Sequence, residues 1–154
     1  MTNKIIGIQG DKLDKINISS DTSIFLAHEA QKLGYKIFYY TPSNLSIIKN
    51  KTYANGVFVK LNYERKKFYK IYKKQKIDVE NFKFILIRQD PPFNSEYLIT
   101  TLILDNLKKT RVINNPVAIR NVSEKLYSKK FIKYMPDTCL LYTSDAADEL
   151  SSVD

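Results

Sequence analysis

Thiol and imidazole side chains are nearly absent: the 154 residues include one cysteine and one histidine. A single cysteine excludes an internal disulfide framework and suits a reducing compartment, so we expect a cytoplasmic protein. With one His and one Cys, the sequence also excludes a zinc site of the usual ligand spacing. No apolar run approaches the ~20 residues of a membrane span, and no signal peptide precedes the first expected strand. We therefore expect no membrane partner.

Glycine is scarce as well, with four in the chain. Gly7 and Gly10 stand near the end of the first expected strand, where a dinucleotide-binding loop would need a third glycine and an immediate helix. The third glycine is missing, so an ordinary turn after the strand is the better interpretation.

Acidic residues are fewer than basic ones, 16 Asp and Glu against 25 Lys and Arg, which gives a net charge of +9. Such a charge suggests nucleic acid or an anionic surface. The pattern predicts a helix over Asn62–Lys76, with Phe68, Tyr69, Ile71 and Tyr72 on one arc and lysines on the opposite arc. Nucleic-acid readers interleave aromatics with exposed charges, whereas here the two segregate. We therefore expect a solvated basic face and no nucleic-acid partner, with a basic α/β nucleic-acid module as the alternative.

Strand and helix patterns alternate along the chain. Apolar runs predict strands, Asn55-Gly56 predicts the turn of a β-hairpin, and capping residues followed by apolar periodicity predict helices. The strands are expected at 4–9, 36–40, 84–87 and 111–114, the hairpin at 52–59, and the other helices after Ser19–Ser23 and at 96–109 and 124–134. This order predicts an α/β fold, with a mostly parallel sheet flanked by helices and a β-hairpin insertion.

The loop Arg88–Phe93, of sequence R-Q-D-P-P-F, follows the buried strand 84–87. Pro91 and Pro92 stiffen the backbone, so Arg88 and Asp90 would stand on a rigid loop at the end of a strand. Ligand sites of α/β sheets lie at such ends. The pair either orients a charged ligand or forms a structural ion pair.

The segment Asp21-Thr22-Ser23 is rich in N-cap residues. The helix that follows would expose N–H groups and the positive end of its dipole, which can receive an anion. Simple capping of the helix explains the same residues.

Four segments resemble, in register, the amino-terminal domain of prokaryotic-type glutathione synthetases. They are Ile16–Ser23, Leu33–Tyr35, Arg88–Phe93 and Asn114–Leu126, and the resemblance covers about residues 3 to 138. It implies a Rossmann-like pre-ATP-grasp domain at 1–122 and the start of the ATP-grasp region at 123–138. The chain departs from the family where Asp11-Lys12 replaces a frequent Asp-Pro and where Ser123 replaces a common Asn.

The resemblance implies an ATP-dependent ligase that joins γ-glutamylcysteine to glycine through an acyl phosphate, with Mg²⁺ or Mn²⁺. It implies that Arg88 and Asp90 orient the peptide substrate, and that Asn114 and Arg120 hold either the substrate or the domain junction. Lys125 of the E-K-L motif would contact ATP phosphate; without the motif, a solvent-facing lysine in a basic helix would be the better interpretation. No catalytic residue, metal ligand or bound cofactor is expected in this chain, which would be inactive alone. The full-length enzyme is expected to be a homo-oligomer.

Residues 139–154 begin C-L-L-Y-T-S-D-A-A-D-E, which resembles a translated transposon-adapter sequence. We therefore expect a non-native tail there, following a gene cut at the end of a sequence fragment.

For the function of the chain, a free-standing domain that binds a small ligand without catalysis is the remaining alternative.

Overall fold

The computed structural model describes residues 4–62, 67–122 and 126–137. The chain divides into two compact units, Met1–Arg120 and Asn121–Asp154. The described part of the second unit contains η4 (Tyr127–Tyr134), a 3-10 segment with a kink at Phe131 and no buried residue. The sequence predicted a helix over 124–134; a 3-10 helix occupies Tyr127–Tyr134, and residues 124 and 125 lie outside the described ones.

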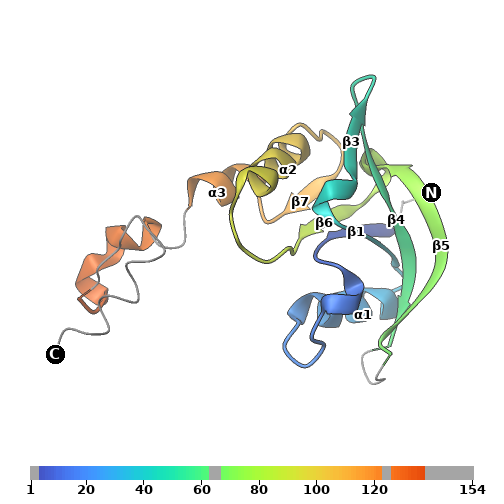
Figure 1. Ribbon diagram of the computed structural model, residues 1–154, viewed down its shortest axis with the longest axis horizontal. Coiled ribbons are helices and arrows are strands. Elements are labelled where there is room, and N and C mark those ends of the chain that lie inside the picture. The colour runs from blue at the N-terminus through green and yellow to red at the C-terminus, as the bar shows by residue number, and fades with distance from the viewer. Residues whose placement is uncertain (1–3, 63–66, 123–125, 138–154) are drawn as a thin grey trace. The chain divides into compact units, whose positions relative to one another are not determined.

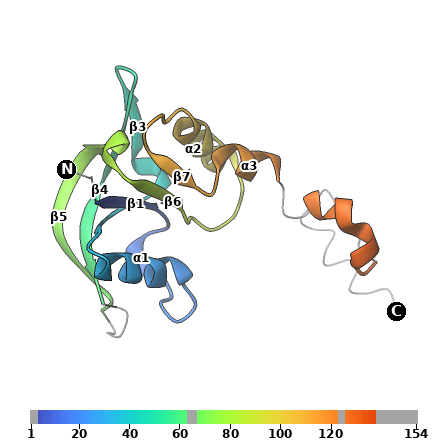
Figure 2. The same ribbon diagram turned by 180° about the vertical axis from the view of Figure 1, so that it is seen from behind.

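The first unit is built on one seven-stranded sheet with the order β3-β4-β2-β1-β6-β7, and β5 pairs with β4 (Figures 1 and 2). The strands are β1 (Ile5–Gln9), β2 (Lys36–Tyr40), β3 (Leu45–Ile48), β4 (Lys51–Leu61), β5 (Tyr69–Asp78), β6 (Phe84–Ile87) and β7 (Arg111–Ile113). Neighbours among β2, β1, β6 and β7 are parallel, whereas β4 is antiparallel to β2, β3 and β5. This confirms the α/β prediction with a mostly parallel sheet and an antiparallel insertion.

Helices cover both faces of the parallel strands, with α1 and α2 on opposite sides (Figures 1 and 2). The helical segments are α1 (Thr22–Lys32), α2 (Ser95–Asp105), α3 (Pro116–Asn121), η1 (Leu13–Lys15), η2 (Pro42–Asn44) and η3 (Val79–Asn81). Ile24 and Ala27 of α1 join one buried core, and Leu104 of α2 joins the other. Strands β1 and β6 are apolar throughout most of their length because a parallel sheet is buried on both faces.

The ends of both long helices follow their local sequence. The Asp21 carboxylate caps α1 by accepting a hydrogen bond from the Ile24 N–H at 2.8 Å. Gly34 takes a left-handed φ of 84° just after the helix, a backbone conformation that favours glycine. The α2 helix ends at Asp105, four residues before the predicted Lys109, and Asn106 is its C-cap.

The predicted turn at Asn55-Gly56 was wrong, because β4 runs straight through both residues. The chain instead turns between β3 and β4 at Lys49 and Asn50, whose φ angles are 48° and 58°. Gly56 is needed for close packing rather than for a turn. A Cβ there would collide with the carbonyl oxygen of Tyr39 and lie 2.8 Å from the Phe38 ring on the neighbouring strand.

The predicted helix over Asn62–Lys76 was also wrong in its described part: the segment from Tyr69 belongs to strand β5, paired with β4, and residues 63–66 lie outside the described ones. A register shift opposite Phe58/Val59 leaves Tyr72 as an extra residue between the paired Ile71 and Lys73. Such a bulge interrupts the alternation of a strand, so the apolar spacing imitates a helix. Pairing with β4 decides the conformation, which the local pattern could not show.

Candidate functional site

The carboxyl ends of β2, β1 and β6 meet where the strand order reverses direction. From β1 the chain crosses to β2 on one side, and it later returns to β6 on the other side of β1. Open α/β sheets bind ligands in the crevice at such a point. Here the loops after β1 and β6 and the start of α1 supply the side chains.

Arg88 leaves β6 and reaches the first turn of α1. Its Nε donates to Ser23 Oγ at 2.8 Å, and its Nη2 donates to Thr22 Oγ1 at 2.7 Å. Within the described residues Arg88 forms no ion pair with Asp90, so the structural-ion-pair interpretation was wrong. The exposed guanidinium has five N–H donors, and these two bonds leave donors available for a ligand.

The loop that begins with Arg88 is attached to the end of β1. The Arg88 N–H donates to the carbonyl of Gln9 at 2.7 Å, and the Asp90 N–H donates to the carboxylate of Asp11 at 3.0 Å. The fully buried side chain of Gln9 donates to the side-chain carbonyl of Gln89. Sequence reasoning gave no role to Gln9 or Asp11. A buried polar residue at the end of an otherwise apolar strand is the signal that could have found Gln9.

Around Arg88 lies a cavity of about 590 Å³. Its charged lining residues are Asp11, Asp21, Asp90, Lys12, Lys15 and Arg88. A second cavity of about 260 Å³ shares Asp11, Lys12 and Asp90 with it and extends to Thr41, Ser43 and Tyr97. Cations and carboxylates in one cavity suit a ligand that carries both signs of charge.

Tyr39 closes the inner side of the larger cavity. Its hydroxyl donates to the backbone carbonyl of Asp11 at 2.7 Å. Burial raises the pKa of Tyr39 far above its usual range, and the charges of Asp21, Asp11 and Asp90 raise it further. The hydroxyl therefore stays protonated at neutral pH and holds the Asp11 backbone. The position of Tyr39 near the end of β2 is the one sequence signal for this role.

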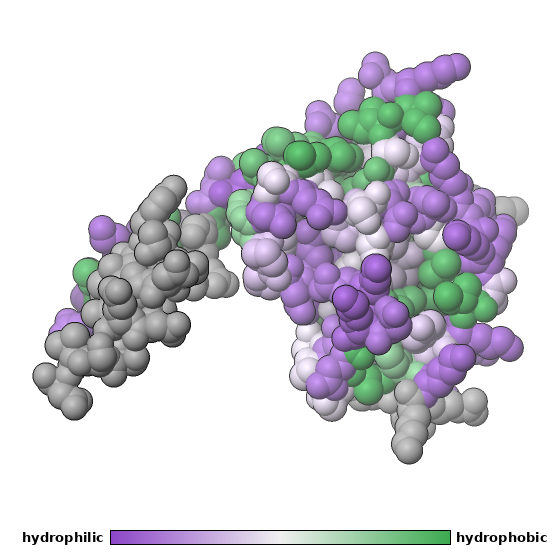
Figure 3. Space-filling view, in the orientation of Figure 1, coloured by the Kyte–Doolittle hydropathy of each residue, from purple (hydrophilic) through white to green (hydrophobic). Residues whose placement is uncertain are grey.

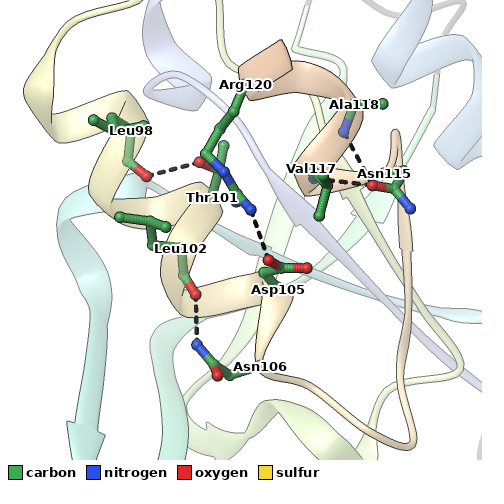
Figure 4. A network of polar contacts seen from close by, with 9 residues as sticks. All are labelled: Leu98, Thr101, Leu102, Asp105, Asn106, Asn115, Val117, Ala118 and Arg120. Carbon is green, nitrogen blue, oxygen red and sulfur yellow. Dashed lines mark hydrogen bonds and ion pairs between the residues drawn. The ribbon is translucent and has the colours of Figure 1, made fainter.

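Asn114 and Arg120 lie elsewhere in the first unit. Asn114 follows β7 and lines a different cavity, of about 410 Å³. Arg120 Nη2 forms an ion pair with Asp105 Oδ2 of α2 at 2.6 Å, beside Thr101 (Figure 4). The structure thus brings Arg88 and Asp90 together with α1, and it does not bring Asn114 or Arg120 into their cavity.

A model of the family described as "Prokaryotic glutathione synthetase, N-terminal domain" matches residues 5–120. The chain belongs to this family. The match contains every residue of the Arg88 cavity, and all four segments of the resemblance begin within it.

Curated glutathione synthetases from several bacteria are similar to this member of the family. The glutathione synthetase of Mesorhizobium japonicum is 37% identical over 88% of this chain and 44% of its own length. The one from Agrobacterium fabrum is 34% identical over 94% and 45%, and the one from Buchnera aphidicola of Acyrthosiphon pisum is 36% identical over 86% and 42%. The chain therefore spans less than half the length of these relatives.

Three further features concern a nucleotide contact, metal ligands and membrane-spanning helices. Lys125, predicted to contact ATP, lies outside the described residues. Among the residues that the structure describes, no group of three His, Cys, Asp or Glu side chains could hold a metal ion. Nor does any helix of that part of the chain have the length and apolar character needed to cross a membrane.

Proposed function

We propose that this chain forms one wall of the peptide-substrate site of a glutathione synthetase, an enzyme that joins γ-glutamylcysteine to glycine with ATP. The observation that carries the proposal is the attachment of Arg88 to Thr22 and Ser23 inside a cavity of mixed charge. Membership of the family supports γ-glutamylcysteine as the ligand of this cavity.

The chemistry of γ-glutamylcysteine fits this cavity. The peptide carries one ammonium group and two carboxylates at neutral pH. A carboxylate would bind the Arg88 guanidinium at the positive end of α1, where charge-assisted hydrogen bonds are strongest. The ammonium would lie between Asp11 and Asp90, which line both cavities. Asp90 therefore keeps its predicted role in orienting the substrate.

We propose that the nucleotide and the metal bind mostly in the part of the full-length enzyme that corresponds to the relatives' length beyond this chain's match. In the proposed reaction the cysteinyl carboxylate takes the γ-phosphoryl group of ATP, which releases ADP and gives an acyl phosphate. Glycine's amine then attacks the acyl carbon, the amide bond forms, and phosphate leaves. A bound Mg²⁺ or Mn²⁺ would screen the phosphate charge. Lys125 is our candidate for a contact with ATP phosphate. This chain's own contribution is to bind and orient the peptide.

A homo-oligomeric full-length enzyme also stays a prediction. The outer face of α2 exposes Leu98, Ile99 and Leu102, with exposed fractions of 39%, 54% and 47%. Figure 3 shows hydrophobic side chains gathered over the region where Figure 1 places α2. Such a face fits a contact with another domain or subunit.

A chimera tests the proposal directly. Residues 5–120 would replace the matching domain of Mesorhizobium japonicum glutathione synthetase, and ATP-dependent formation of glutathione would be measured. We expect activity in the chimera and none in this chain alone. Inactivity of a chimera that folds would contradict the proposal.

Arg88 variants of the chimera test the site itself. Arg88→Ala should raise the KM for γ-glutamylcysteine about tenfold, as expected for the loss of a charge-assisted hydrogen bond of ~1.4 kcal/mol. Arg88→Lys should recover little, because an ammonium cannot bridge two hydroxyls in the geometry of a guanidinium. Arg111→Ala, at an exposed position on β7, is the matched control and should leave KM unchanged. Equal effects of the two alanine variants would reject Arg88 as a substrate contact.

A further inference from the structure

Strand β5 is an open edge of the sheet. It pairs with β4 along one side, and no described residue pairs with its other side. Residues 70–76 are all exposed. The outer side of such a strand offers a row of unpaired N–H and C=O groups, to which another extended chain can pair.

The charges along this edge have one sign. Lys70, Lys73 and Lys74 form no ion pair within the described part of the chain, and the Lys76 ammonium lies 5.3 Å from the centre of the Tyr53 ring. The one carboxylate of β5, Asp78, faces Lys51 at 4.0 Å. Figure 3 shows hydrophilic side chains over much of the rim at which Figure 1 places β5. The edge therefore carries an uncompensated positive charge.

The lysines point to both faces of the sheet. From Lys73 to Asp78 the register with β4 is regular, because the bulge lies before Lys73. Ile77 is buried in the core that includes Phe58, so Lys73 shares its face. Lys74 and Lys76 occupy the opposite face. A strand added beside this stretch would meet a lysine whichever way its side chains point.

We propose that β5 binds an acidic peptide in extended conformation, which adds to the sheet beside Lys73–Asp78. The backbone of the edge supplies the hydrogen bonds of such strand addition, and cross-strand pairs of opposite charge supply the selectivity. This surface shares no residue with the cavity of Arg88, so it is independent of the proposed function.

Two other occupants fit the edge less well. A second copy of β5 would place lysine opposite lysine, which destabilises a strand pair. Single-stranded nucleic acid needs aromatic rings available for stacking on one face. The exposed aromatic residue of β5 is Tyr72, and its ring already stacks on Phe58 with a centroid distance of 5.8 Å. An acidic strand would form hydrogen bonds with the unpaired backbone groups of β5 and would also neutralise the charges of its lysines.

The experiment uses the complete chain and a labelled peptide of about six residues with alternating Glu and Thr, matched to a typical strand length. Fluorescence anisotropy should show saturable binding that weakens as salt is added. Backbone NMR should place the largest shifts at residues 73–78. A peptide of the same charge with proline at alternate positions should bind about tenfold more weakly, because every second N–H donor is missing and the proline rings hinder strand pairing.

Paired variants locate the site. The double substitution Lys73→Glu, Lys74→Glu should weaken binding about tenfold or more. Lys129→Glu, Lys130→Glu, the same change of charge on η4, should leave it unaltered. Circular dichroism verifies that both variants are folded. The proposal is overturned if no saturable binding occurs, or if the proline peptide or an oligothymidylate binds as tightly as the Glu-Thr peptide. In those cases the lysines only prevent another strand from pairing with the edge, or they attract anions that form no backbone hydrogen bonds with β5.

Discussion

The backbone N–H of Asp90 donates to the Asp11 carboxylate at 3.0 Å, although 79 residues separate the two in sequence. Through this bond the end of β1 fixes the start of the proline loop. Both residues line the two cavities beside the carboxyl ends of β1 and β6.

Replacing Asp11 separates its positioning role from its charge. Asp11→Ala removes the acceptor of the Asp90 N–H, and we expect a loss of about 1 kcal/mol in the free energy of unfolding. In the chimera it should raise the KM for γ-glutamylcysteine about fivefold. Asp11→Asn keeps an oxygen acceptor, so it should preserve the melting temperature and still raise KM. An asparagine variant with an unchanged KM would show that the Asp11 charge does not contact the ammonium.

Much of the fold could be predicted from short-range pattern. The apolar runs at Ile5–Gln9 and Phe84–Ile87 are strands because parallel sheets bury both faces, and the Asp21 cap marked the start of α1. Strand β5 could not be predicted in this way. Its bulge breaks the alternation, and its lysines suit helices as well as exposed strands.

The candidate site was predictable in its parts but not in its assembly. Arg88 and Asp90 were found because charged residues follow a buried strand and precede two prolines. The partners Thr22 and Ser23 stand about 65 residues away, and local sequence carries no sign of that contact. The role of Asp11 likewise depends on the parallel pairing of β1 with β6.

The turn between β3 and β4 offers a test of the corrected hairpin. Lys49 and Asn50 both have positive φ, which costs an ordinary residue ~1 kcal/mol or more. Replacing the pair with Asn-Gly should raise the free energy of unfolding by about 0.5–1 kcal/mol.

The substitution Gly56→Ala should lower the free energy of unfolding by about 1–3 kcal/mol, because the added methyl group meets Phe38 and the Tyr39 carbonyl. Urea denaturation measures the free energy of unfolding of this variant and of the Asn-Gly variant. A harmless Gly56→Ala would contradict the close approach of β2 and β4.

Glu80 should make stability depend on acid pH. Its carboxylate accepts backbone N–H bonds from Lys108, Lys109 and Thr110 at 2.7, 2.9 and 2.9 Å. Burial raises the pKa of Glu80, but these three bonds and the Lys109 charge outweigh it, so the pKa is lowered overall. Because the pKa of Glu80 is lower in the folded protein than in the unfolded chain, ionised Glu80 stabilises the fold at pH values above the unfolded pKa of ~4.3. This stabilisation is lost as the pH falls through the pKa of the folded protein.

The substitution Glu80→Gln tests this linkage through melting temperatures measured from pH 7 to pH 3. The variant should be less stable than the parent at pH 7, and the difference should shrink as pH falls toward 3, because protonation removes the charge that the three N–H groups stabilise. Glu29→Gln, which removes a carboxylate paired with Lys32 on the surface of α1, is the control. A difference that stays constant with pH would show that Glu80 is not ionised in the folded protein.

The pair of Arg120 and Asp105 decides between the two roles left open for Arg120. The two side chains are 16% and 37% exposed and join α3 to α2 at 2.6 Å (Figure 4). Asp105→Asn leaves a half-buried guanidinium without its counter-charge, so it should cost about 1–3 kcal/mol, or roughly 4 °C in melting temperature per kcal/mol. In the chimera it should leave the KM for γ-glutamylcysteine unchanged, because neither residue lines the Arg88 cavity. If Arg120 bound the substrate instead, Arg120→Lys would raise KM while the melting temperature stayed at the parent's value. Measuring both quantities on both variants therefore assigns Arg120 to the fold or to the substrate site.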